Sequence, residues 1–167
     1  GNDLPKRKLD VLIKLAEAYK FAGRSLLAAE AFENAARLSD QDKRVICEQR
    51  AAEQYLYGGH LGKGIGAMEN VLAGIGETLP QTPRRALLSL LKNRMKLVIR
   101  GAKFKSISKN EVSEALKNRL DIYNVVSSSM AMIDNIRGAD FQVRGLLLAL
   151  DVGEPTQIIF AMGLEAS

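Results

Sequence analysis

The sequence predicts an all-α fold, and two observations carry that prediction. Apolar residues recur at intervals of three and four along nearly the whole chain, which is the period of an amphipathic helix. No segment alternates polar and apolar residues with β-branched enrichment over the length of a strand. We therefore expect about eight antiparallel helices joined by short turns.

Glycines and polar caps separate the first four helices. Gly23 ends the first helix and Gly58-Gly59 ends the third, since glycine readily adopts the conformation that terminates a helix. Ser39-Asp40 closes the second helix and supplies a cap for the third. The four helices are expected at residues 9–22, 26–38, 43–57 and 61–75.

The second half begins with a clear start signal. Thr82 is a hydroxyl cap, Pro83 fits the first helical position, and Gly101 ends the helix that they open. We expect residues 103–109 to form a basic connector between two helices. Asp134 and Asp140 bracket Gly138 in a predicted loop and read as caps of the next helix. The remaining helices are expected at residues 110–133, 139–152 and 155–165.

Composition excludes several classes of site. The 167 residues suit a single domain over residues 1–167. Cys47 and His60 are the only cysteine and histidine, so neither a disulfide framework nor a structural zinc site is predicted. No apolar run approaches the roughly 20 residues that span a bilayer, so we expect a cytoplasmic protein without a membrane partner. The missing initiator methionine and the end inside an apparent helix suggest an excised piece of a longer chain.

The first helix pair has definite spacings of small and aromatic residues. Ala16 and Ala28 would allow the two helices to approach closely, Gly23 would make the turn, and Tyr19 and Phe32 would fill the gap. These residues, within positions 9–42, resemble a tetratricopeptide repeat. The second pair matches the pattern with an offset of two at Ala51, Ala52, Tyr55, Gly59, Gly64, Met68 and Val71. Its Gly64 and Gly66 would need close packing to offset their cost of about 1 kcal/mol each in a helix.

The repeat resemblance implies a short right-handed superhelix with an irregular centre. Its repeats would lie near residues 9–42, 43–78, 82–135 (remodelled) and 139–167. Such pairs bind extended peptides with their first helices, and the resemblance places candidate partner-binding residues there: Glu17, Lys20, Phe21, Glu53 and Tyr57, with Asp10, Ile13, Gln49 and Leu56 on the same face. The corresponding residues of the third pair are Leu88, Leu91, Met95 and Val98. We expect the helix after Lys109 to cover these four, because they would otherwise expose an apolar patch.

A wider resemblance covers most of the chain. Residues 79–91, 136–150 and 51–55 resemble the helical-repeat region of large bacterial serine/threonine protein kinases, in which a kinase domain and an AAA-type ATPase module precede such repeats. The resemblance implies a non-catalytic regulatory or partner-binding segment. It transfers no active-site residue and implies no cofactor. The protein-kinase signatures His-Arg-Asp and Asp-Phe-Gly are both missing from the sequence.

Three local patterns have structural explanations. Residues 58–64 resemble a phosphate-binding loop, but one residue is missing between the glycines, Gly64 replaces the Ser or Thr, and no strand precedes; a turn is expected. Cys47 is expected to pack as a small hydrophobe rather than act as a nucleophile. Residues 127–129, all serine, read as a small-residue helix face.

The charge distribution is the most informative functional feature. Residues 84–119 hold eleven of the chain's cations against Glu111 and Glu114, a net charge of +9 within a chain of +5. The eleven are Arg84, Arg85, Lys92, Arg94, Lys96, Arg100, Lys103, Lys105, Lys109, Lys117 and Arg119.

Positions 92, 96, 100 and 103 predict a basic stripe along one helix face. The stripe is either a solvated face or a dock for an acidic protein or peptide, which could belong to the same parent chain. A regulator domain that binds nucleic acid through residues 84–119 is the alternative. It is the weaker one, since only Phe104 interleaves the cations.

Overall fold

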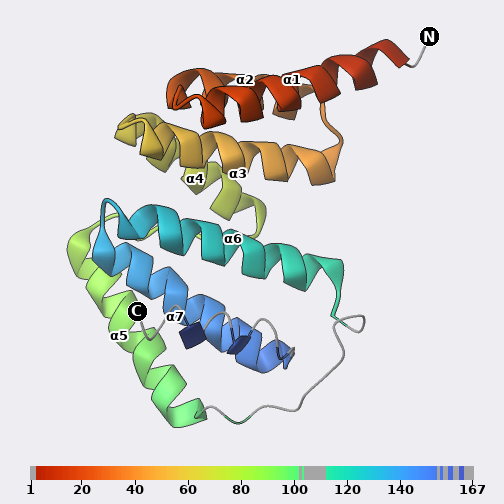
Figure 1. Ribbon diagram of the computed structural model, residues 1–167. Helices are drawn as coiled ribbons and strands as arrows, with labels where there is room; N and C mark the ends of the chain where they lie inside the picture. The colour runs from red at the N-terminus through yellow and green to blue at the C-terminus, as the bar shows by residue number, and fades with distance from the viewer. Residues whose placement is uncertain are drawn as a thin grey trace. The chain divides into compact units, whose positions relative to one another are not determined.

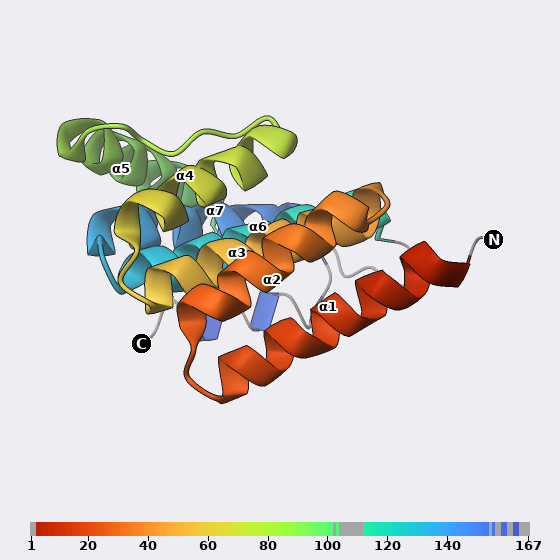
Figure 2. The ribbon, with the colours of Figure 1, turned by 90° about the horizontal axis from the view of Figure 1, so that it is seen from above.

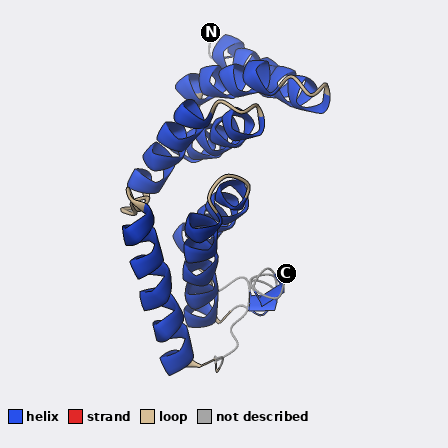
Figure 3. Cartoon of the chain, turned by 90° about the vertical axis from the view of Figure 1, so that its left-hand side faces the viewer, coloured by secondary structure: helices blue, strands red, loops and turns tan. Residues whose placement is uncertain are grey.

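The computed structural model describes residues 3–101, 103, 112–153, 155, 158–159 and 162–163. Within these ranges all regular structure is helical, and no strand occurs (Figure 3). The all-α prediction is therefore confirmed. The helices are α1 (Asp3–Phe21), α2 (Ser25–Leu38), α3 (Gln41–Tyr57), α4 (Leu61–Gly74), α5 (Pro83–Arg100), α6 (Glu114–Ala131) and α7 (Asn135–Val152). The helix expected at residues 155–165 lies largely outside the described residues.

The chain divides into two compact units, Gly1–Thr78 and Leu79–Ser167. The expectation of one continuous repeat domain stays a prediction. In the first unit each helix packs on the next, α1 on α2, α2 on α3 and α3 on α4 (Figures 1 and 2). In the second unit α7 contacts both α5 and α6.

Alanines surround the Phe32 ring in one cluster of the core of the first unit. Ala16 and Ala28 are fully buried, as is Phe32, and Tyr19 packs against the cluster that Ala16 and Phe32 form with two further alanines. Gly23 has a φ of +70°, a conformation that favours glycine, so the predicted turn residue is confirmed. Alanine on facing helices permits the close approach that buries the ring between them.

Gly64 shows how closely α3 and α4 approach. A Cβ at this position would lie 2.4 Å from Leu56 Cδ2 and 3.1 Å from the Leu56 backbone nitrogen, so the expected close packing is confirmed there. Gly66 has open space around it, so the same expectation is wrong at that position.

Polar caps fix the helix starts of both units. Asp40 accepts a hydrogen bond from the Lys43 backbone N–H at 3.1 Å, and Thr82 accepts one from the Arg85 N–H at 3.3 Å before Pro83. Gly101, with a φ of +68°, ends α5 as predicted.

The predicted loop around Gly138 is wrong. Asp134 does act as a cap, accepting from the backbone N–H groups of Ile136 and Arg137, but it starts α7 at Asn135 rather than near residue 139. Gly138 therefore lies inside the helix, where a Cβ would come within 2.7 Å of the Ala131 backbone nitrogen of α6. The glycine serves close packing of two helices rather than a turn.

Candidate functional site

Three of the predicted groove residues of the first unit lie near one another. Glu17 on α1 forms ion pairs with Lys20, at 4.0 Å, and with Arg50 on α3. Burial raises the pKa of Glu53, although Lys20 and Arg50 oppose that effect. Arg50 also lies over the Phe32 ring, 5.7 Å from its centroid. The sequence-based set omitted Arg50, although its position three residues before Glu53 was a signal for the shared face.

The remaining groove predictions divide between exposed and buried residues. Phe21 and Tyr57, at the ends of α1 and α3, are exposed. Gln49 and Leu56 are buried instead, and Leu56 packs against Gly64 of α4. The exposed part of this face thus combines two aromatic rings with nearly balanced charges. Such a surface suits binding and has no nucleophile paired with a base.

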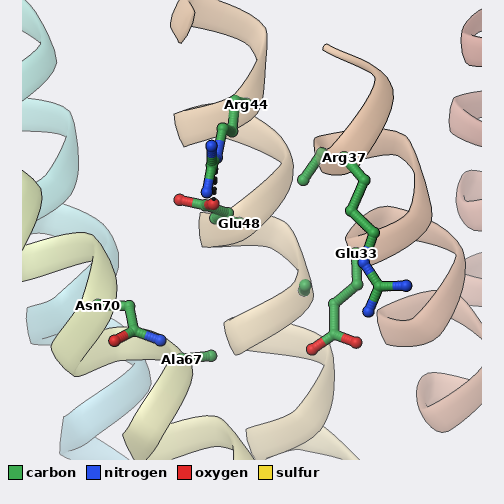
Figure 4. A pocket seen from close by; sticks show the side chains of 8 residues that line it. Glu33, Arg37, Arg44, Glu48, Ala67 and Asn70 are labelled. Atoms are coloured by element: carbon green, nitrogen blue, oxygen red, sulfur yellow. Dashed lines mark hydrogen bonds and ion pairs between the residues drawn. The ribbon is translucent and has the colours of Figure 1, made fainter.

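A hollow of about 400 Å³ lies on α2, α3 and α4, where no site was predicted (Figure 4). Its charged walls are Glu33 and Arg37 of α2 and an Arg44–Glu48 ion pair of 2.8 Å on α3. Burial and a hydrogen bond to Glu33 raise the pKa of Tyr55 to about 12. The charges are already balanced within the wall, so the hollow has no net preference for an ion.

The cations of the predicted basic stripe do not form one continuous row in the structure. Arg84, Arg85, Lys92, Lys96 and Lys103 are exposed. Arg100 instead turns toward α7, where its Nε donates to Asp151 Oδ1 at 2.6 Å, and its Nη1 donates to the carbonyls of Gly101 and Lys103.

Farther along the segment, Lys117 pairs with Glu114 at 2.9 Å, and Lys105 and Lys109 lie outside the described residues. The prediction of one continuous row through Arg100 is therefore wrong, since that guanidinium anchors α5 to α7.

The prediction that a helix covers the apolar face of α5 is also wrong. Leu88, Leu91, Met95 and Val98 are 66%, 52%, 64% and 81% exposed. The helix expected over them, α6, packs on α7 instead. Leu87 and Ile99 are exposed beside them. We call these six residues the outer strip of α5.

The opposite face of α5 holds a buried polar cluster that sequence reasoning missed. Asp140 of α7 is 0% exposed and accepts hydrogen bonds from Ser89 Oγ at 2.9 Å and from Asn93 Nδ2 at 2.8 Å. Arg144 Nη2 donates to Asp140 Oδ2 and to Ser89 Oγ, both at 2.8 Å. A carboxylate with three donors is satisfied, so the cluster fixes how α5 lies on α7. It has no cleft for a substrate, and capping, the predicted role of Asp140, is wrong.

A signal for this cluster was present in the sequence. Ser89 and Asn93 lie four residues apart in a helix that is otherwise apolar or cationic, and Asp140 and Arg144 have the same spacing in the helix that packs on it. Two such pairs on neighbouring helices are typical of a shared polar contact.

The other local patterns occupy a turn and helix positions. Residues 58–60 form the turn between α3 and α4, with Gly59 at a φ of +77°. Cys47 is buried, and burial raises the pKa of its thiol, which disfavours the thiolate. Ser127 and Ser129 are buried on α6, and Ser128 donates to the Asn124 carbonyl.

Comparison of the chain with protein-family models, curated proteins and solved structures finds no match. Over the described residues, no helix combines the length and the apolar character that crossing a bilayer requires. The same part of the chain brings no three His, Cys, Asp or Glu side chains together as a metal ion would need.

Proposed function

We propose that this chain is a non-catalytic protein-interaction scaffold. The observation that carries the proposal is the outer strip of α5, where six large apolar side chains face solvent on one helix. Contiguous exposed apolar surface of this kind is typical of protein-interaction sites. The charged and aromatic face on α1 and α3 is a second surface suited to a peptide.

The scaffold is proposed to belong to a multidomain bacterial serine/threonine protein kinase with an ATPase module. The support is the resemblance of residues 79–91, 136–150 and 51–55 to the repeat region of such kinases. In that setting the repeats would read a partner or another segment of the parent chain, and catalysis would reside elsewhere.

A protein partner fits the outer strip better than nucleic acid does. Phosphate groups are contacted by Arg and Lys, by polar side chains and by backbone N–H groups. On α5 the centre is apolar, with Lys92 and Lys96 beside it, and Arg100 is occupied by Asp151. A nucleic-acid backbone laid on this helix would desolvate leucine, methionine and valine without contacting most of the charges.

Affinity capture tests the proposal. Wild-type protein and a Leu91→Ser/Met95→Ser variant are compared for the proteins that each retains from lysate of the source cell. The control is Leu4→Ser/Val11→Ser on α1, which replaces two apolar side chains that are also more than half exposed. The proposal predicts a protein retained by wild type and control and lost with the α5 variant, at low and high salt alike. Tight binding of duplex DNA with a steep salt dependence, or ATP turnover by the chain, would refute it.

A further inference from the structure

The outer strip of α5 has the spacing of a coiled-coil seam. Leu88, Leu91, Met95 and Val98 follow one another at intervals of three, four and three residues. A repeat of this kind keeps the apolar side chains in line along a helix, so that a second helix can pack over them. The face is long enough for about three turns of a partner helix, at 5.4 Å per turn.

Cations flank this seam, and the helix itself offers them no carboxylate. α5 contains six Lys and Arg residues and no Asp or Glu. Arg85, Lys92 and Lys96 are exposed, and at 100° per residue they fall together along one edge of the strip. In a coiled coil such edge positions select the partner by charge. This edge would accept carboxylates and repel cations.

We propose that the outer strip binds an acidic amphipathic helix of a partner protein. Its apolar seam packs on Leu88, Leu91, Met95 and Val98, and its glutamate or aspartate side chains face Arg85, Lys92 and Lys96. The inference rests on the proposed interaction function and adds the chemistry of the partner.

Charge and composition favour this occupant over two others. A second copy of α5 would bring cations against cations in either orientation, because the helix has no carboxylate to offer. A helix on a lipid surface presents Trp, Phe or Leu on its apolar face; α5 presents leucine but none of the aromatic rings that anchor a helix at the headgroups.

The rest of the second unit prepares α5 for docking. Its inner face is fixed to α7 by the Asp140 cluster and, at its end, by the Arg100–Asp151 ion pair of 2.6 Å. Thr82 and Gly101 cap its two ends. A helix held in this way loses little further freedom when a partner binds, which raises affinity.

The test uses the full 167-residue chain and two labelled peptides. Both carry leucine at the seam positions of three heptads; one has glutamate at the flanking positions and the other lysine, so that like charges keep each peptide monomeric. Fluorescence anisotropy at low salt is expected to show the glutamate peptide binding at least about tenfold more tightly, from three exposed ion pairs. The Lys92→Glu/Lys96→Glu variant should reverse the preference.

Controls separate this inference from the proposed function. Leu91→Ser/Met95→Ser should abolish binding of both peptides, and Leu4→Ser/Val11→Ser should leave binding unchanged. Equal binding of the two peptides would overturn the acidic partner while the interaction function stands. Failure of both peptides to bind would overturn the helical partner, and the capture experiment would then decide the function by itself. Stronger binding to phosphatidylserine vesicles, or a dimer that the serine variant abolishes, would overturn the inference in favour of a membrane or a second copy.

Discussion

Replacing Asp140 by alanine should loosen the packing of α5 on α7 and lower the free energy of unfolding of the second unit. The carboxylate is fully buried and accepts from Ser89, Asn93 and Arg144 at 2.8–2.9 Å. Its removal takes the carboxylate acceptor away from a buried amide and a largely buried guanidinium. The cost of breaking a buried pair by removing one partner is about 3–5 kcal/mol.

That magnitude is large against the 5–15 kcal/mol that typically stabilises a domain. Urea unfolding followed by circular dichroism measures the loss, and hydrogen exchange of α5 and α7 peptides locates it. The matched control is Asp121→Ala at an exposed position of α6, where partial burial of the carboxyl and the nearby Glu114 raise its pKa, so removing the charge should cost little. A variant that replaces Ser89, Asn93, Asp140 and Arg144 together by apolar residues of similar size should recover most of the stability.

A loss below about 1 kcal/mol for Asp140→Ala would refute the reasoning, since it would match an ordinary exposed hydrogen bond. Faster exchange spread over both units instead of α5 and α7 would refute it as well, because the cluster joins only those two helices.

Three further predictions address packing and ionisation. Gly138→Ala should lower the free energy of unfolding, measured by urea denaturation, by about 1–3 kcal/mol, because the added Cβ would meet the Ala131 backbone. Gly66→Ala, at a position with open space, should raise it by up to about 1 kcal/mol. Equal effects of the two substitutions would contradict the packing account. Because burial raises the pKa of Glu53, this carboxyl favours the folded state below its ordinary pKa of 4.5, and that contribution is lost as the pH rises through the raised value. The free energy of unfolding of wild type, measured against Glu53→Gln, should therefore fall from acidic to neutral pH, and a rise would show the opposite shift. Buried Cys47 should react with a thiol reagent at neutral pH much more slowly in the folded protein than in urea, and equal rates would show that the thiol is accessible.

Local sequence signals predicted the helices well because each boundary has its own chemistry. Thr82-Pro83, Asp40 and the glycines at 23, 59 and 101 act within a few residues, so their effect can be read without knowing the tertiary structure. Gly138 misled the same reasoning. Its role depends on Ala131 of a neighbouring helix, a contact that no local pattern reveals.

The candidate site was predictable only where one helix determines it. Exposure of Lys92 and Lys96 and the apolar period of α5 follow from the sequence of that helix. The partner of each face does not: α6 packs on α7 and leaves the outer strip exposed, and Arg100 finds Asp151, which lies 51 residues away. Pairing of distant helices decides these outcomes, and a single sequence gives little information about it.

Site-specific photo-crosslinking from Met95 in the source cell tests the central claim most directly. A photoreactive side chain at this position lies in the middle of the outer strip, and the same group at exposed Val11 of α1 serves as the control. We predict a crosslink from position 95, absent from position 11, to a helix of a partner protein with acidic flanks. A crosslink from position 95 to lipid or nucleic acid, or none at all, would contradict the account.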